Sequence, residues 1–148
     1  MIISNSLVLL DANILVYAAD KSSPFYKRSV MIREKGMKGE ISICVCPQVL
    51  TEFFAIITDP RRVANPRTQK EALEEIEEYL LEDKVFKIYQ LPNIIEIMLK
   101  LLKQHRIKRQ KIFDLQLVAT MLANDVKQIY TYNKKDFEKF QEIKVLIP

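Results

Sequence analysis

Acidic and amide side chains recur in this sequence near the points where one expected element ends and the next begins. They fall into four groups: Asp11 with Asn13, Glu52, Asp114, and Thr131 with Asn133 and Asp136. In open parallel sheets, ligands bind outside the carboxyl ends of the strands. Several carboxylates at one such edge repel one another unless a cation joins them. The pattern therefore predicts a divalent-metal site.

Each group, taken singly, also has an ordinary structural explanation. Asp11 after an apolar run is typical of an Asx turn or a helix cap, and Asp114 at the start of a helix offsets the helix dipole. Glu52 fits an exposed stripe on its helix, and Asn133 followed three residues later by Asp136 has the pattern of a helix N-terminal cap. Only a shared position at one sheet edge favours the metal site over these explanations.

The scarcity of histidine, cysteine and glycine excludes several other kinds of site. His105, Cys44 and Cys46 are too few to provide the four ligands of a structural zinc site. Gly36 and Gly39 are the two glycines, and neither a GxGxxG nor a GxxxxGK phosphate loop can be built from them. Hard oxygen ligands without histidine or cysteine select Mg²⁺ or Mn²⁺.

Apolar, β-rich runs alternate with helical patterns along the whole chain. Strands are expected over residues 6–10, 41–46, 85–89, 128–131 and 143–147. Helices are expected over residues 13–20, 24–35, 49–57, 68–81, 93–102, 114–124 and 134–140. Such alternation indicates a parallel sheet covered by helices. We expect a single α/β domain over residues 1–148, built as a three-layer α/β/α sandwich with a parallel five-stranded sheet.

Three of the expected helices have recognisable ends or faces. Pro24 suits the first position of one helix, which Gly36 and Gly39 end. Thr68 with Glu71 is a capping box for an amphipathic helix that carries Leu73, Ile76, Leu80 and Leu81. Asn93 suits the cap of a helix whose inward face is formed by Ile94, Ile97, Met98, Leu101 and Leu102.

Four segments combine the acidic residues with apolar neighbours. They are LLDANILVYA, PQVLTEFFAIITDPRRV, FDLQLVATMLAN and IYTYNKKDF. Together they resemble the PIN domain, specifically the VapC type found in bacterial and archaeal toxins, and the resemblance covers nearly the whole chain. PIN domains are metal-dependent ribonucleases, and Asp11, Glu52 and Asp114 match the three most characteristic acidic positions of that family.

The chain departs from the family at the fourth acidic position. That position is usually an aspartate in a T-x-D pattern, whereas this chain has Thr131, Tyr132 and Asn133. Asn133 can still bind a metal through its carbonyl oxygen or through a water, and Asp136, one helical turn further on, is a possible substitute. Whether one or two ions bind stays open at this point.

The resemblance implies an endoribonuclease in which Asp11, Glu52 and Asp114 hold Mg²⁺ or Mn²⁺. The ion activates water for in-line attack on an RNA phosphodiester, which leaves a 5′ phosphate. Asn13 and Thr131 are expected to support these acids. The resemblance further implies a homodimer and the toxin of a type II toxin–antitoxin pair, neutralised by an antitoxin protein that inserts a segment into the catalytic groove.

Basic residues flank two of the site segments. The net charge of +4 permits a polyanionic partner without demanding one. The candidates for RNA phosphate contacts are Arg61, Arg62, Arg106, Lys108, Arg109 and Lys111. Phosphate contacts of this kind carry no sequence information and weaken with salt. For any one of these residues, a solvated basic loop is an equally good explanation.

Two other functions compete with the nuclease. A non-catalytic PIN-like module that binds RNA or protein is supported by Asn133 in place of an acid. A haloacid-dehalogenase-like phosphatase is suggested because Asp11, Ala12 and Asn13 approach that family's DxD motif. The second aspartate and the later paired acids of that family are missing, which disfavours the phosphatase.

The sequence also bears on where the protein works. The longest uncharged runs, such as residues 41–51, have about half the length of the ~20 apolar residues needed to cross a bilayer. A signal peptide would require a basic residue before its apolar stretch, and none precedes the apolar stretch at the N-terminus. Cys44 and Cys46 share one strand face with a poor geometry for a disulfide. We expect a cytoplasmic protein with no membrane contact.

Overall fold

Five parallel strands form the central sheet of the computed structural model, which describes residues 6–148. The strands are β1 (Val8–Leu10), β2 (Ile43–Val45), β3 (Phe86–Lys87), β4 (Gln128–Tyr130) and β5 (Lys144–Leu146). Their order in the sheet is β3-β2-β1-β4-β5, with every neighbouring pair parallel. The strand order therefore reverses at β1, which lies between β2 and β4. The predicted parallel five-stranded sheet is confirmed.

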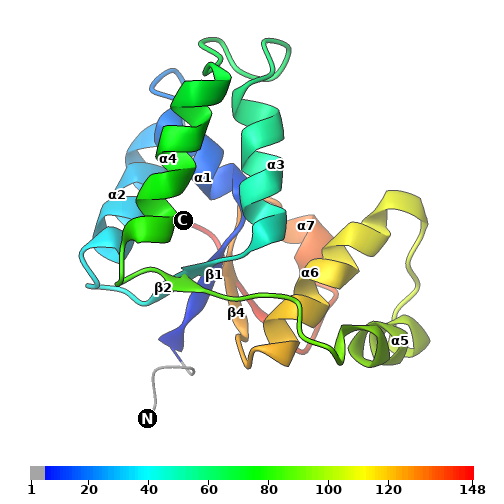
Figure 1. The fold of residues 1–148 in the computed structure, drawn as a ribbon. Helices are drawn as coiled ribbons and strands as arrows, with labels where there is room; N and C mark the ends of the chain where they lie inside the picture. The colour runs from blue at the N-terminus through cyan, green and yellow to red at the C-terminus, as the bar shows by residue number, and fades with distance from the viewer. Residues whose placement is uncertain (1–5) are drawn as a thin grey trace.

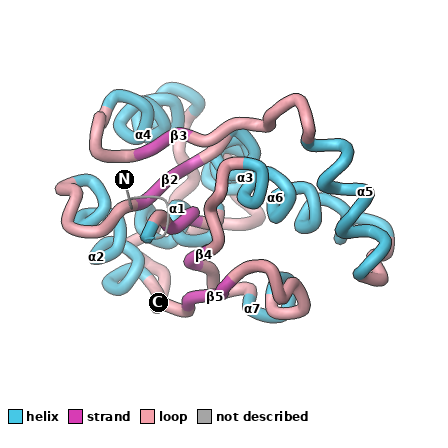
Figure 2. The backbone as a smooth tube through the Cα atoms, turned by 90° about the horizontal axis from the view of Figure 1, so that it is seen from below, coloured by secondary structure: helices cyan, strands magenta, loops and turns pink. Residues whose placement is uncertain are grey.

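Helices cover both faces of this sheet. They are α1 (Ala12–Ala19), α2 (Tyr26–Met37), α3 (Pro47–Ile57), α4 (Gln69–Leu81), α5 (Ile94–Gln104), α6 (Ile112–Ala123) and α7 (Lys134–Phe137), with a 3₁₀ turn at Arg109–Lys111. Figure 1 shows α2 and α4 on one side of the strands and α5 and α6 on the other, and Figure 2 shows the same three layers from below. Within residues 6–148, no helix is long and apolar enough to span a membrane.

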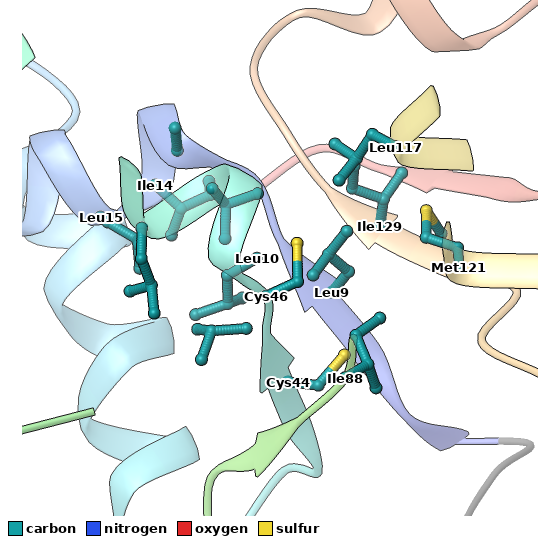
Figure 3. Packing of buried hydrophobic residues seen from close by; sticks show 14 of the residues in the cluster. Leu9, Leu10, Ile14, Leu15, Cys44, Cys46, Ile88, Leu117, Met121 and Ile129 are labelled. Carbon is teal, nitrogen blue, oxygen red and sulfur yellow. The ribbon is translucent and has the colours of Figure 1, made fainter. Parts of the chain in front are cut away.

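The core forms on both faces of the central strand. Leu9 and Leu10 are fully buried neighbours in β1, and the period of two along a strand sends their side chains to opposite faces. Figure 3 shows Leu10 with Ile14 and Leu15 of α1, and Leu9 with Ile129 of β4. The whole strand is therefore buried, which matches its uninterrupted apolar sequence and holds the residue that follows it in a fixed place.

Two predicted helix faces differ from the structure. The capping box of α4 is confirmed, because Thr68 and Glu71 exchange both hydrogen bonds. However, Leu73, Leu80 and Leu81 of α4 are exposed, and the buried residues are instead Ala72 and Tyr79. These two lie seven residues apart and share one face, where the Tyr79 hydroxyl accepts a hydrogen bond from Arg33 of α2 at 3.2 Å. In α5, Leu101 is buried, whereas Leu102 is also exposed.

Several predicted helix ends shift by one turn or less. The second helix begins at Tyr26, because Ser23 forms a turn in which its hydroxyl accepts a hydrogen bond from the backbone N–H of Phe25. Gly36 lies within this helix, and only Gly39, with a positive φ of 76°, follows its end. Asn93 occupies the N-cap position of α5 but makes no side-chain capping hydrogen bond.

Candidate functional site: an acidic cleft at the carboxyl ends of the strands

The predicted acids gather around one cleft. Its volume is about 760 Å³, and the predicted site residues that line it are Asp11, Asn13, Glu52, Asp114, Asn133 and Asp136. Asp11 directly follows β1, Glu52 lies on the second turn of α3, and Asp114 lies on the first turn of α6. Asn133 precedes α7 and Asp136 belongs to it. The cleft lies where strand order reverses, as expected for a ligand site in an open parallel sheet.

Asp11 is buried and held by three hydrogen bonds. Only 5% of the surface of Asp11 is exposed. One carboxylate oxygen accepts from the backbone N–H of Ala12 at 2.8 Å, and the other accepts from the Thr131 hydroxyl at 2.8 Å and the Asn13 amide at 3.2 Å. Burial nevertheless outweighs these bonds and raises the pKa of the Asp11 carboxyl. The orientation of this carboxylate is therefore fixed by the fold.

Asn13 and Thr131 also join the two segments that flank the cleft. The Asn13 amide nitrogen donates to the Thr131 hydroxyl at 3.1 Å, and its carbonyl oxygen accepts from the backbone N–H of Tyr132 at 3.2 Å. The Thr131 hydroxyl in turn accepts from the backbone N–H of Asn133 at 2.9 Å. The loop after β4 is thus pinned to the start of α1, which places Asn133 at the cleft.

The other acids repel one another across the cleft. Partial burial raises the pKa of Glu52, and the negative charges of Asp11 and Asp114 raise it further, while Arg62 opposes the shift. Burial also raises the pKa of Asp114 to about 6, with Asp136 adding to the effect and Lys111 opposing it. These carboxylates therefore favour either a proton or a cation as a partner.

A lysine ammonium already lies among these acids. Lys111, in the turn before α6, donates to the Asp136 carboxylate and lies 3.9 Å from a carboxylate oxygen of Asp114. Asp136 raises the pKa of Lys111, as expected for a close opposite charge. Positive charge is thus stabilised at the point where α6 and α7 bring two carboxylates together.

The donor set fits a hard divalent cation. Carboxylate oxygens from Asp11, Glu52 and Asp114, with an amide oxygen from Asn133, are the ligands that Mg²⁺ and Mn²⁺ prefer. Among residues 6–148, however, no three histidine, cysteine or acidic side chains are already grouped closely enough to hold one metal ion. The acids line one cleft, but in the described residues no three of them lie close enough together to surround one ion. The metal site therefore stays a prediction.

Arg62 is the predicted RNA contact that lines the cleft beside the acids. The Arg61 side chain donates a hydrogen bond to the Asp59 carboxylate at 3.2 Å. It is nevertheless 88% exposed. Lys111 is engaged with Asp136. The remaining three, Arg106, Lys108 and Arg109, are exposed in the segment before α6. Their contacts with RNA stay predictions.

Sequence reasoning missed a second set of cleft residues, which are aromatic or carry amides. They include Tyr17, Gln48, Gln90, Phe113 and Gln116. The Gln48 amide nitrogen donates to the backbone carbonyl of Phe113 at 3.0 Å, which ties α3 to the start of α6. The sequence positions could have indicated two of them. Phe113 directly precedes Asp114, and Gln48 lies one helical turn before Glu52.

Comparisons with known proteins identify a family and several relatives. A profile of the PIN domain family matches residues 8–143. The chain is 22% identical to Ribonuclease VapC48 of Mycobacterium tuberculosis over 138 residues, which covers 93% of this chain and 94% of the relative. It is 25% identical to Ribonuclease VapC24 of the same organism over 134 residues, which covers 90% of this chain and 91% of the relative.

Solved structures show the same fold. VapC20 of Mycobacterium tuberculosis, a toxin that cleaves the sarcin–ricin loop, has a TM-score of 0.65 at 11% identity and covers 90% of this chain and 95% of its own. VapBC2 from Rickettsia felis, bound to a DNA fragment from its promoter, has a TM-score of 0.62 at 16% identity and covers 96% of this chain and 98% of its own. At these identities the likeness concerns the fold.

Proposed function

This chain belongs to the PIN domain family, and from that premise we propose that it is a Mg²⁺- or Mn²⁺-dependent endoribonuclease that hydrolyses RNA phosphodiester bonds. The observation that carries the proposal is the position of Asp11, Glu52 and Asp114 around one cleft, although they are far apart in the sequence. The two relatives that are named ribonucleases support it.

We assign the metal to Asp11, Glu52 and Asp114, with Asn133 and Asp136 as further oxygen donors. When bound, a divalent ion activates water for attack on phosphorus and offsets the negative charge that develops there. Asp11 supplies a carboxylate whose direction is fixed by Thr131. Asp114 carries a pKa of about 6 and therefore releases its proton near neutral pH, which leaves a carboxylate free for the cation.

Arg62 is the residue that we assign to the RNA backbone nearest the acids, because it lines the cleft. Its guanidinium can bind a phosphate through two parallel hydrogen bonds. It also offsets the negative charge of Glu52, since it opposes the rise in the pKa of that side chain. The exposed residues Arg61, Lys108 and Arg109 would add contacts further out, where screening by salt is stronger.

We further propose that the chain is the toxin of a type II toxin–antitoxin pair, works in the cytoplasm and forms a homodimer. The support comes from structural neighbours that are toxin–antitoxin assemblies, such as VapBC2 from Rickettsia felis. A complex from Klebsiella pneumoniae is described as toxin–antitoxin and has a TM-score of 0.59 at 17% identity. Co-expression with the product of a short adjacent reading frame, followed by co-purification, tests the antitoxin partner.

The activity is tested by incubating single-stranded RNA with the protein in Mn²⁺ or Mg²⁺, with and without EDTA. We expect cleavage to leave 5′ phosphates, to stop in EDTA, and to fall by at least about 100-fold in Asp11→Asn, as when one preorganised charge-stabilising group is lost. Asp125→Asn is the matched control, because the Asp125 side chain is 68% exposed and lies outside the cleft.

Two outcomes would contradict the proposal. RNA that stays intact with the wild-type protein in Mn²⁺, yet is bound, would favour the non-catalytic binding module. Cleavage that persists unchanged in Asp11→Asn would show that the preparation owes its activity to another nuclease. Asp125→Asn should match the wild type in both rate and product ends.

A further inference from the structure

Phe113 is an exposed aromatic residue in the wall of the acidic cleft. It lies in the first turn of α6, directly before Asp114, and is 58% exposed. Other large hydrophobic residues are exposed in the described chain, but Phe113 is the one among them that also lines the cleft. A single exposed hydrophobic residue is ordinary on a protein surface, but an aromatic side chain that lines a cleft beside polar groups is typical of a ligand site.

The side chain of Phe113 is largely exposed, while its backbone is held by a hydrogen bond. Gln48 donates to the backbone carbonyl of Phe113 at 3.0 Å, which holds the first turn of α6 against α3. Within residues 6–148, no other aromatic ring packs against Phe113, whereas Tyr17, Phe25 and Tyr132 pack against one another. Phe113 therefore offers an aromatic face at a fixed position beside Asp114.

The surroundings of this ring suit a nucleobase. Three side-chain amides, those of Gln48, Gln90 and Gln116, line the same cleft. Amides can donate to and accept from the edge of a base, and an aromatic ring attracts the face of any base without relying on charge. This matters here because the neighbouring carboxylates repel the phosphates of RNA and offer the bases no flat surface.

We propose that Phe113 is the stacking platform for a nucleobase next to the cleaved phosphodiester. The inference rests on the proposed nuclease function and deepens it by naming the residue that would hold a base of the substrate. Bases in an A-form duplex are stacked on their neighbours, and a protein ring reaches their faces only where the strand is single or looped. The amides of Gln90 and Gln116 would contact the edge of the stacked base, while the Gln48 amide holds the backbone of Phe113.

The chain contains no tryptophan, which permits a direct test. Phe113→Trp, combined with Asp11→Asn to prevent cleavage, places a single indole at the proposed platform. We expect single-stranded RNA of eight nucleotides to quench its fluorescence saturably, and the same sequence in a duplex to leave it unchanged. The control is Phe86→Trp in the same background, because Phe86 is exposed on β3 and lies outside the cleft.

Kinetics provide a second readout. Phe113→Ala should raise the KM for single-stranded RNA on the order of 10-fold, as for loss of one base–aromatic stack, while Phe113→Tyr should keep the wild-type KM. Binding of labelled RNA by Phe113→Trp without a change in its fluorescence would overturn the stacking role and leave the nuclease proposal intact. Equal quenching by the single strand and by the duplex would also overturn it. Quenching by RNA with a wild-type protein that cleaves nothing would support the platform and contradict the nuclease.

Discussion

Asp11 and Asp114 show two ways of holding a carboxylate in the cleft. Asp11 is buried and has three hydrogen-bond donors, so its direction is set before any ligand arrives. Asp114 is half-buried, faces Asp136, and has a pKa of about 6. Repulsion among such groups lowers the stability of the folded protein, and it is retained where a function needs concentrated negative charge. We therefore expect the metal-free protein to be less stable when these acids are ionised.

This expectation has a definite sign. The pKa of Asp114 is about 6 in the folded protein against an ordinary value of 3.8, so the folded state binds more protons between these values than the unfolded state. The stabilising effect of the protonated form is complete below the ordinary pKa and is lost as pH rises through the folded pKa. In EDTA, the free energy of unfolding should fall by about 1 kcal/mol from this group between pH 4 and 7, after allowance for solvent screening.

Denaturant unfolding at several pH values measures the effect. Asp114→Asn should flatten the fall in unfolding free energy and be more stable than the wild type at pH 7. Asp125→Asn, at an exposed position away from the cleft, should keep the wild-type pH dependence. An identical slope in Asp114→Asn and the wild type would show that Asp114 titrates in the folded protein as it does in the unfolded chain.

The sequence alone predicted the acidic residues of the cleft better than the residues beside them. Asp11 and Asp114 could be found because a charge that ends an apolar run or begins an apolar helix is conspicuous. Phe113 was missed because an aromatic residue at the start of an apolar helix has the same pattern whether it faces the core or a cleft. The pairing of Lys111 with Asp136 joins residues 25 positions apart, and no local pattern reveals it.

The contact between α2 and β2 depends on a glycine inside the helix. Gly36 is buried, and a Cβ at this position would lie 2.7 Å from Cγ1 of Ile43. Ile43 is fully buried in β2 and β-branched, so it has little room to move. The sequence pattern favoured Gly36 as a helix end, since glycine weakens a helix interior. Close packing on the sheet explains its presence there instead.

Gly36→Ala tests this packing. Alanine favours a helix over glycine by about 1 kcal/mol, but overpacking against Ile43 typically costs 1–3 kcal/mol, and we expect a net loss of about 1 kcal/mol in unfolding free energy. Adding Ile43→Val should reduce the penalty, which a double-mutant cycle measures. Lys35→Ala, at the exposed neighbouring position, is the control. A Gly36→Ala variant as stable as the wild type would show that Ile43 moves aside without a cost in stability.

The topology of the whole sheet is what brings the site together. β1 and β4 are neighbours although 120 positions separate Asp11 from Thr131, and the backbone N–H of Asp11 donates to the carbonyl of Tyr130 at 3.0 Å. The sequence predicted the strands and the edge at which acids would meet, because alternating strands and helices leave a parallel sheet as the natural arrangement. It did not determine the strand order, which depends on contacts distant in the chain. The interpretation of residues 1–148 as one domain stays a prediction.

The most direct test is to locate a divalent ion in crystals of the protein soaked in Mn²⁺, by anomalous scattering. We predict a peak in the cleft, coordinated by carboxylate oxygens of Asp11 and Asp114, with Glu52 in contact directly or through water. The same soak of Asp11→Asn crystals should lose the peak or weaken it strongly. A wild-type cleft without a peak at saturating Mn²⁺, or a peak whose ligands include neither Asp11 nor Asp114, would contradict the proposed site and the nuclease that depends on it.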